Sequence, residues 1–213
     1  MTPAEQSAEA ARICRLAPVV PVLVIEDAGH AKMLAQALVA GGLPALEVTL
    51  RTPAALDAIR AMAEVPGGVV GAGTLLTPAD VKAAKAAGAR FGVSPGATER
   101  ILDACAEQDL PLLPGAATAS EVMALLERGH TVQKFFPAEQ AGGAAFLKAL
   151  SSPLPQVSFC PTGGITADSA GRYLSLPNVL CVGGSWVAPA AAVAAGDWAA
   201  VEALARAAAG LPR

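Results

Sequence analysis

Three ionisable side chains interrupt segments that are otherwise apolar. Lys134 lies in TVQKFFP (131–137), at a position where an alternating strand would carry an apolar residue. Glu47 and Arg51 lie in EVTLRT (47–52). An amine, a carboxylate and a guanidinium could supply a nucleophile, a proton-transfer group and a partner for a substrate carboxylate.

The alternation of side chains along a strand decides where these groups point. Glu47, Thr49 and Arg51 are two residues apart, so they share one face of a strand. In a barrel the outward face packs beneath helices, where Glu and Arg are costly to bury, so the inward face is favoured for them and for Lys134. Partial desolvation and the charge of Arg51 favour a neutral, nucleophilic amine, whereas Glu47 favours the ammonium form. A plain salt bridge between Lys134 and Glu47 is the alternative.

Two glycine pairs suggest a phosphate site. They occur in TGGIT (162–166) and VGGSW (182–186), directly after two apolar runs. Backbone NH groups that glycine exposes, together with a following helix N-terminus, bind phosphate without a basic side chain. Tight turns also require glycine, so either pair alone is weak evidence, but their joint position matches the phosphate loops of α/β barrels.

The elements that must position these groups alternate along the chain. Short β-branched runs are separated by alanine-rich segments with a helical period, the pattern of repeated βα units around a parallel sheet. The eight runs span residues 19–25, 45–50, 69–74, 89–94, 110–115, 131–136, 156–162 and 178–185. Helices are expected between them, for example over residues 30–42, 53–64, 78–88, 98–108, 119–129 and 167–176.

Eight such units predict an α/β fold, a (β/α)8 TIM barrel formed as one domain over residues 1–213. The polar segment at 1–16 predicts an extra N-terminal helix, and the alanine-rich tail at 190–209 predicts a final one. An open doubly wound sheet is the rival architecture, but no GxGxxG motif follows the first run. In a barrel, functional side chains lie at the C-terminal ends of the strands.

Composition excludes several classes of protein. The net charge is −3 with no basic tract, which argues against nucleic acid or an anionic membrane as a partner. No apolar run approaches the roughly 18 to 20 residues that span a bilayer, and no secretory signal is evident, so a cytoplasmic location is expected. The four cysteines are scattered without CxxC spacing and the two histidines are expected at the surface, so we expect buried free thiols and no metal site.

The chain resembles the family of 2-keto-3-deoxy-6-phosphogluconate (KDPG) aldolase and 4-hydroxy-2-oxoglutarate aldolase. The motifs that carry the resemblance follow one another over nearly the whole chain: PVLVIED, EVTLRT, VGAGT, VSPG, PLLPGAAT, KFFPAE, FCPTGGI and CVGGSW. The resemblance implies a (β/α)8 fold and a homotrimer. It also implies a metal-independent class I aldolase of the Entner–Doudoroff pathway, which forms pyruvate and glyceraldehyde 3-phosphate without a cofactor.

The resemblance also implies roles for individual residues. Lys134 would form the Schiff base and Glu47 would transfer protons. Arg51 and Thr74 would bind the pyruvyl carboxylate. The remaining implied contacts are the pocket walls Pro95 and Phe136, the substrate contact Thr162, and the phosphate-binding residues Gly163, Gly164, Gly184 and Ser185.

Other functions stay open on the sequence alone. The substrate could be the C4 epimer, 2-keto-3-deoxy-6-phosphogalactonate, or 4-hydroxy-2-oxoglutarate, and the same imine could decarboxylate oxaloacetate. A noncatalytic phosphosugar-binding barrel, with Lys134 only a counter-ion, belongs to a different class. Reductive trapping with pyruvate separates the enzyme from the binding module.

Overall fold

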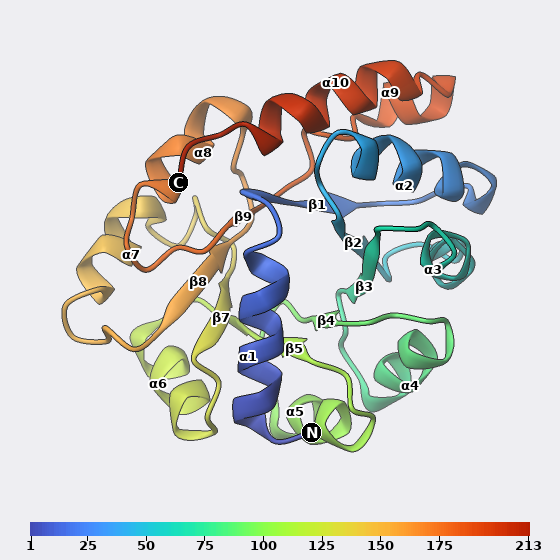
Figure 1. The fold of residues 1–213 in the computed structure, drawn as a ribbon. Helices are drawn as coiled ribbons and strands as arrows, with labels where there is room; N and C mark the ends of the chain where they lie inside the picture. The colour runs from blue at the N-terminus through green and yellow to red at the C-terminus, as the bar shows by residue number, and fades with distance from the viewer.

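Short parallel strands form a ring at the centre of the molecule, and helices surround it (Figure 1). The computed structural model describes residues 1–213. Every pairing between neighbouring strands is parallel, as repeated βα units require. The strands are β1 (Val19–Leu23), β2 (Ala45–Thr49), β3 (Val69–Gly73), β4 (Gly92–Val93), β5 (Leu112–Leu113), β6 (Gly115–Ala116), β7 (Val132–Phe135), β8 (Ser158–Pro161) and β9 (Val182–Gly184).

The ring closes through two short connections. One sheet has the order β5-β4-β3-β2-β1-β9 and the other β6-β7-β8. Only Pro114 separates β5 from β6; because proline has no N–H to donate, it divides the expected run at 110–115 into two segments. At the other seam, Thr162 bridges to Gly183 and joins β8 to β9. Counting β5 and β6 as one strand, the chain forms the predicted (β/α)8 barrel, and the open sheet is excluded.

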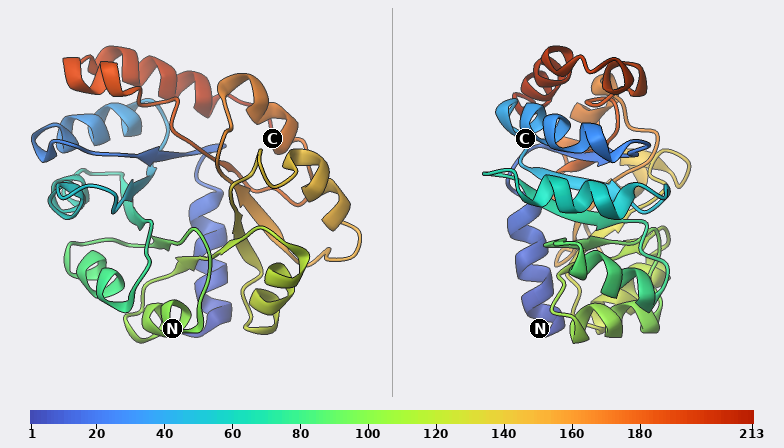
Figure 2. Two further views of the ribbon diagram at one scale, coloured as in Figure 1. Left: turned by 180° about the vertical axis from the view of Figure 1, so that it is seen from behind. Right: turned by 90° about the vertical axis from the view of Figure 1, so that its right-hand side faces the viewer.

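The helices form an outer layer around the strands (Figure 2). They lie in the chain as expected, except that Gly196, with a φ of 66°, divides the predicted final helix into two. Another helix lies between β7 and β8. The helices are α1 (Pro3–Cys14), α2 (Ala31–Ala40), α3 (Ala55–Ala63), α4 (Pro78–Ala86), α5 (Glu99–Glu107), α6 (Ala119–Glu127), α7 (Gly143–Leu150), α8 (Ala167–Leu174), α9 (Ala190–Ala195) and α10 (Trp198–Ala209), with a 3-10 turn η1 (Ala28–His30) before α2.

Threonine side chains fix where several helices begin. Thr2, Thr77, Thr118 and Thr166 each accept a hydrogen bond from the backbone N–H three residues later, and the side chain at that later position bonds back to the threonine N–H. Such a cap contributes about 1 kcal/mol. The caps at Thr77, Thr118 and Thr166 also end the loops that follow β3, β6 and β8, so they help to fix the loops at the C-terminal end of the barrel.

The extra N-terminal helix α1 covers the opposite end of the barrel, where the strands begin (Figures 1 and 2). Its buried face contains Ala10, Ile13 and Cys14. These side chains pack against the first inward residues of the strands, including Val20 and Val132. A second, larger apolar layer lies between the strands and the outer helices. The barrel is therefore closed at one end and accessible to ligands only at the other.

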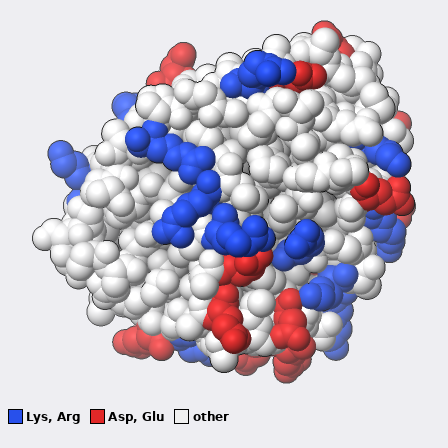
Figure 3. Space-filling model, in the orientation of Figure 1, with Lys and Arg blue, Asp and Glu red and all other residues white.

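The surface carries charges of both signs. The face that α1 covers shows both basic and acidic side chains, with wide uncharged areas between them (Figure 3). None of the helices combines the length and the apolar character that crossing a bilayer demands.

The expectation that both histidines lie at the surface was wrong for His130. Its side chain is buried just before β7, where the His130 backbone N–H donates to the carbonyl oxygen of Leu125 at the end of α6, and its Nδ1 has no hydrogen-bond partner. Burial, with a contribution from Arg128, lowers the pKa of His130 to about 4.

Candidate active site

Lys134 and Glu47 meet inside the barrel. Lys134 lies on β7 and Glu47 on β2, and the distance from Lys134 Nζ to Glu47 Oε1 is 3.3 Å. Both side chains are buried, with exposed fractions of 6% and 3%. The two strands are not neighbours, so the side chains reach across the interior, as alternation along each strand predicts.

A glycine on the next strand makes room for the carboxylate. Gly73, at the end of β3, pairs in register with Thr49 on β2. A Cβ atom at Gly73 would overlap Glu47 Oε1 and its side-chain carbons. The second glycine of the VGAGT motif is therefore required for steric reasons, because Glu47 can keep its position only when residue 73 has no side chain.

The surroundings of Glu47 favour its protonated form. Burial raises the pKa of Glu47 above the usual range, and the charge of Lys134 offsets only part of this effect. A carboxyl group whose pKa lies closer to neutrality can both accept and donate protons during turnover. The Phe136 ring lies 5.1 Å from Lys134 Nζ and shields the nitrogen from water on that side.

A short chain of hydrogen bonds positions Arg51. The Arg51 Nε–H donates to Thr49 Oγ1 over 3.0 Å, and the Thr49 hydroxyl donates to the carbonyl oxygen of Leu23 on β1 over 2.9 Å. Thr49 is buried, whereas Arg51 is exposed at the end of β2. The predicted shared face of Glu47, Thr49 and Arg51 therefore runs from the barrel interior to its mouth.

A cavity of about 180 Å³ lies at this mouth. It brings together residues of β1 and β9 and residues that follow β2, β7, β8 and β9, and among them are most of those expected to contact substrate. The lining residues are Val22, Arg51, Phe136, Thr162, Gly163, Gly164, Ile165, Gly183, Gly184 and Ser185. Sequence alone does not indicate Val22 and Ile165, which are apolar wall residues without a distinguishing motif.

The loop after β8 contains two successive glycines with positive φ angles. Gly163 and Gly164 have φ values of 108° and 75°, which side-chain-bearing residues rarely adopt. Thr166 then caps α8, so the helix N-terminus with its partial positive charge follows directly. Gly184, the last residue of β9, and Ser185, which follows it, border the same cavity. The two glycine pairs thus meet at one place, as the barrel prediction requires.

Thr74 and Pro95 do not line this cavity. Thr74 follows β3 at the C-terminal end of the barrel and has a φ of 60°, a left-handed conformation that costs a non-glycine residue roughly 1 to 3 kcal/mol. Pro95 follows β4, and its carbonyl group lies against Gly115. Both belong to the same end of the barrel as Arg51, but no contact with Lys134 or Glu47 places them in the site.

A larger cavity of about 660 Å³ adjoins the first one and shares Val22 and Ser185 with it. Its lining is mostly apolar and includes Trp186. Lys134 and Glu47 line neither cavity, but the smaller and more polar one contains Arg51, both glycine pairs and Phe136, whose ring lies over Lys134 Nζ, so it is the candidate site.

Cys160 is a neighbour of the lysine that the sequence did not single out. It pairs in register with Lys134 on the adjacent strand. Hydrogen bonding from the thiols of Cys14 and Cys181, together with the Lys134 charge, lowers the pKa of the Cys160 thiol. The scattered cysteines of the sequence are therefore partly gathered beneath the Lys134–Glu47 pair.

Comparison with known proteins agrees with this geometry. The family model described as "KDPG and KHG aldolase" matches residues 10–204. The chain belongs to this family. It is 57% identical to 2-dehydro-3-deoxy-phosphogluconate aldolase of Zymomonas mobilis over 84% of this chain and 86% of that protein. It is 52% identical to the KHG/KDPG aldolase of Escherichia coli over 89% of each.

Solved structures of family members share the barrel. The 2-keto-3-deoxy-6-phosphogluconate aldolase of Zymomonas mobilis ZM4 with 3-phosphoglycerate gives a TM-score of 0.92 at 53% identity, covering 97% of this chain and 98% of that one. The KDPG aldolase of Legionella pneumophila, with pyruvate captured as a covalent carbinolamine intermediate, gives 0.91 at 46% identity, covering 94% and 98%. A carbinolamine is the adduct that precedes an imine, so a family member works by class I chemistry.

Proposed function

We propose that this protein is a class I aldolase that cleaves 2-keto-3-deoxy-6-phosphogluconate into pyruvate and glyceraldehyde 3-phosphate. The observation that carries the proposal is the buried amine of Lys134, 3.3 Å from the Glu47 carboxylate beneath a cavity at the barrel mouth. The named activities of relatives at 52% and 57% identity support the same substrate.

Lys134 provides the electron sink. Its neutral Nζ attacks C2 of the keto acid to form a carbinolamine, which loses water to give a protonated imine. The imine accepts electrons more readily than the ketone does, so a metal ion is not needed to polarise C2. Transfer of a proton from Lys134 to Glu47 over their 3.3 Å contact would generate the neutral amine. Glu47 would then give this proton to the hydroxyl group that leaves the carbinolamine as water, which restores the carboxylate.

Glu47 then moves the protons of the cleavage step. The carboxylate takes the proton of the C4 hydroxyl, the C3–C4 bond breaks, and its electron pair enters the imine to form an enamine. Glyceraldehyde 3-phosphate leaves. Glu47 returns a proton to C3, and water hydrolyses the resulting pyruvyl imine to release pyruvate and Lys134. A raised pKa suits a carboxyl group that serves as base and then as acid.

Residues at the C-terminal end of the barrel hold the two charged ends of the substrate. Arg51, fixed through Thr49, is positioned to pair with the carboxylate, and Thr74 would donate to it from the end of β3. The backbone of the two glycine pairs and the Ser185 hydroxyl would bind the phosphate. Thr162 lines the same cavity as Phe136 and would contact the C4 region, and Pro95 would close the wall from β4.

Two related substrates and one different function remain as alternatives. Cleavage of 4-hydroxy-2-oxoglutarate is favoured as a second activity by the KHG/KDPG relative in Escherichia coli. The C4 epimer of the first substrate differs only at the hydroxyl that Glu47 deprotonates, so kcat/KM on the two epimers decides between them. A noncatalytic barrel would bind phosphosugar without covalent chemistry.

Reductive trapping tests the proposal. Incubation with pyruvate and borohydride should place a reduced pyruvyl adduct on the peptide that contains Lys134. Lys134→Met should abolish the adduct, whereas the exposed Lys148→Met should retain it. An unmodified Lys134 peptide, or an adduct spread over surface lysines, would refute the imine mechanism and favour the binding module.

We further propose that the working form is a cytoplasmic homotrimer, as the family resemblance implies. Light scattering combined with size-exclusion chromatography measures the mass in solution. A mass of one or two chains would refute the trimer without affecting the proposed chemistry.

A further inference from the structure

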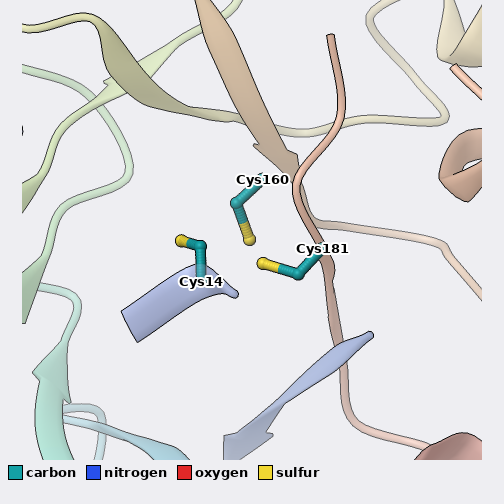
Figure 4. Close-up of side chains that lie close together, drawn as sticks. All are labelled: Cys14, Cys160 and Cys181. Atoms are coloured by element: carbon teal, nitrogen blue, oxygen red, sulfur yellow. The ribbon is translucent and has the colours of Figure 1, made fainter. Parts of the chain in front are cut away.

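Three cysteine side chains converge at the closed end of the barrel (Figure 4). Cys14 ends α1, Cys160 lies on β8, and Cys181 directly precedes β9. Their sulfur atoms all lie within 4.8 Å of one another. All three residues are buried, with exposed fractions of 2%, 2% and 0%. The fourth cysteine, Cys105, lies on α5 outside this cluster.

The spacing of the sulfur atoms suits one small, soft ion. Thiolate–zinc bonds are about 2.3 Å long, so three sulfur atoms around a trigonal ion lie about 4 Å apart. The cluster is therefore close to this geometry without movement of the backbone. Three separate elements supply the ligands, so the ion would join α1 to two strands of the barrel.

The surroundings favour a cation over three free thiols. Cys14 is the last residue of α1, and the C-terminal end of a helix carries partial negative charge. No carboxylate competes as a ligand within the cluster. Apolar side chains such as Val20 and Phe91 surround it and exclude water, which strengthens metal–thiolate bonds.

We propose that Cys14, Cys160 and Cys181 form a three-thiolate site for a thiophilic metal ion of the Zn²⁺, Cd²⁺ or Cu⁺ type. Three sulfur–metal bonds form, the thiol protons pass to solvent, and no oxidation or reduction takes place. The ion lies beneath Lys134 and Glu47 and closes the base of the barrel. The site is independent of the aldolase proposal, whose imine chemistry requires no metal.

Entry to the site requires movement of α1. The sulfur atoms are buried, but the other face of α1 is exposed, so partial release of this helix would uncover Cys14. Loading is therefore expected to be slow compared with binding to surface thiols, and affinity must be measured after equilibration.

Cadmium is a suitable probe because thiolate–Cd²⁺ bonds absorb in the ultraviolet. We expect the full-length, reduced protein to bind one Cd²⁺ per chain with a charge-transfer band, and X-ray absorption to detect three sulfur ligands. Replacing Cys14, Cys160 or Cys181 by Ser should each remove the three-sulfur signature and weaken binding by at least about tenfold in competition with a chelator. Cys105→Ser is the matched control and should bind as the parent does.

Each outcome decides for or against the site. Failure of the intact protein to bind, or fewer than three sulfur ligands, would overturn the proposal. So would a band that persists in a cluster variant or disappears in Cys105→Ser.

Since a buried Ser can destabilise the fold, Cys181→Ala is measured in parallel, and Cd²⁺ should raise the melting temperature of the parent but not of this variant. Aldolase activity of the metal-free protein tests the proposed function separately.

Discussion

Glu47 occupies space that exists only because residue 73 lacks a side chain. A Cβ at Gly73 would overlap Oε1 of Glu47, the oxygen that faces Lys134 Nζ. The carboxylate position is therefore set by a glycine on the neighbouring strand as well as by its own strand. This packing links the backbone of β3 to the proposed proton transfers.

Gly73→Ala should lower kcat by about 10²-fold, because a displaced carboxylate loses much of the contribution of general acid–base catalysis. The matched control is Gly96→Ala, since a Cβ at Gly96 meets no atom within 4 Å and its φ is ordinary. Steady-state kinetics of both variants check this. Equal activities for the two would show that Glu47 does not need its present position.

Glu47→Gln should lower kcat by about 10²- to 10⁴-fold while the amine of Lys134 still forms a trapped pyruvate adduct. The amide cannot exchange the C4 hydroxyl and C3 protons, but it leaves the nucleophile in place.

The parent enzyme should also lose activity on acidification at a pH above the usual Glu range, because burial raises the pKa of Glu47. Measurements are kcat, adduct mass and the pH profile; a variant with parental kcat would exclude Glu47 as the proton-transfer group.

Ser185→Ala should raise KM for the phosphorylated substrate by roughly tenfold, because a hydrogen bond to a charged group contributes about 1.5 kcal/mol or more. The concentration of pyruvate that half-saturates adduct formation should not change, since pyruvate carries no phosphate. Comparing the two values separates a phosphate contact from a general loss of structure. Equal shifts in both would place the phosphate elsewhere.

The free energy of unfolding should decrease as the pH falls from about 6.5 to about 4, because of His130. Burial lowers its pKa to about 4, so in this range the unfolded chain binds a proton that the folded chain does not. Stability therefore falls as pH decreases, by roughly 3 kcal/mol in total at about 1.4 kcal/mol per pH unit. Urea unfolding of His130→Leu should show a shallower decline over this range than the parent.

Gly171→Ala should stabilise the protein by about 0.5 to 1 kcal/mol. Gly171 lies within α8, where a Cβ meets no atom within 4 Å, and alanine reduces the freedom of the unfolded chain. Urea unfolding measures the gain. Gly88→Ala is a contrasting variant that should destabilise, because its φ is 100°.

Local patterns in the sequence were sufficient to predict the helices and strands and the directions in which their side chains point. Alternation around Glu47 and Lys134 predicted that both point inward, because a period of two is a property of any extended strand. The glycine pair at 163–164 lies where the backbone turns, as expected, whereas Gly183 and Gly184 lie within β9, where a Cβ would overlap Thr162 or Trp186. The tail at 190–209 shows the limit, since Gly196 ends one helix and Asp197 caps another within one alanine-rich segment.

Only the tertiary structure decided which of these residues meet. Lys134 and Glu47 are separated by 87 positions and come together because the sheet closes on itself, which depends on all strands at once. The same closure places Cys14, Cys160 and Cys181 around one point, although their spacing in the chain resembles no metal motif. Sequence periodicity indicates which face of a helix or strand is buried. Contacts between residues far apart in the chain form only when the whole ring of strands is packed, so no local sequence pattern predicts them.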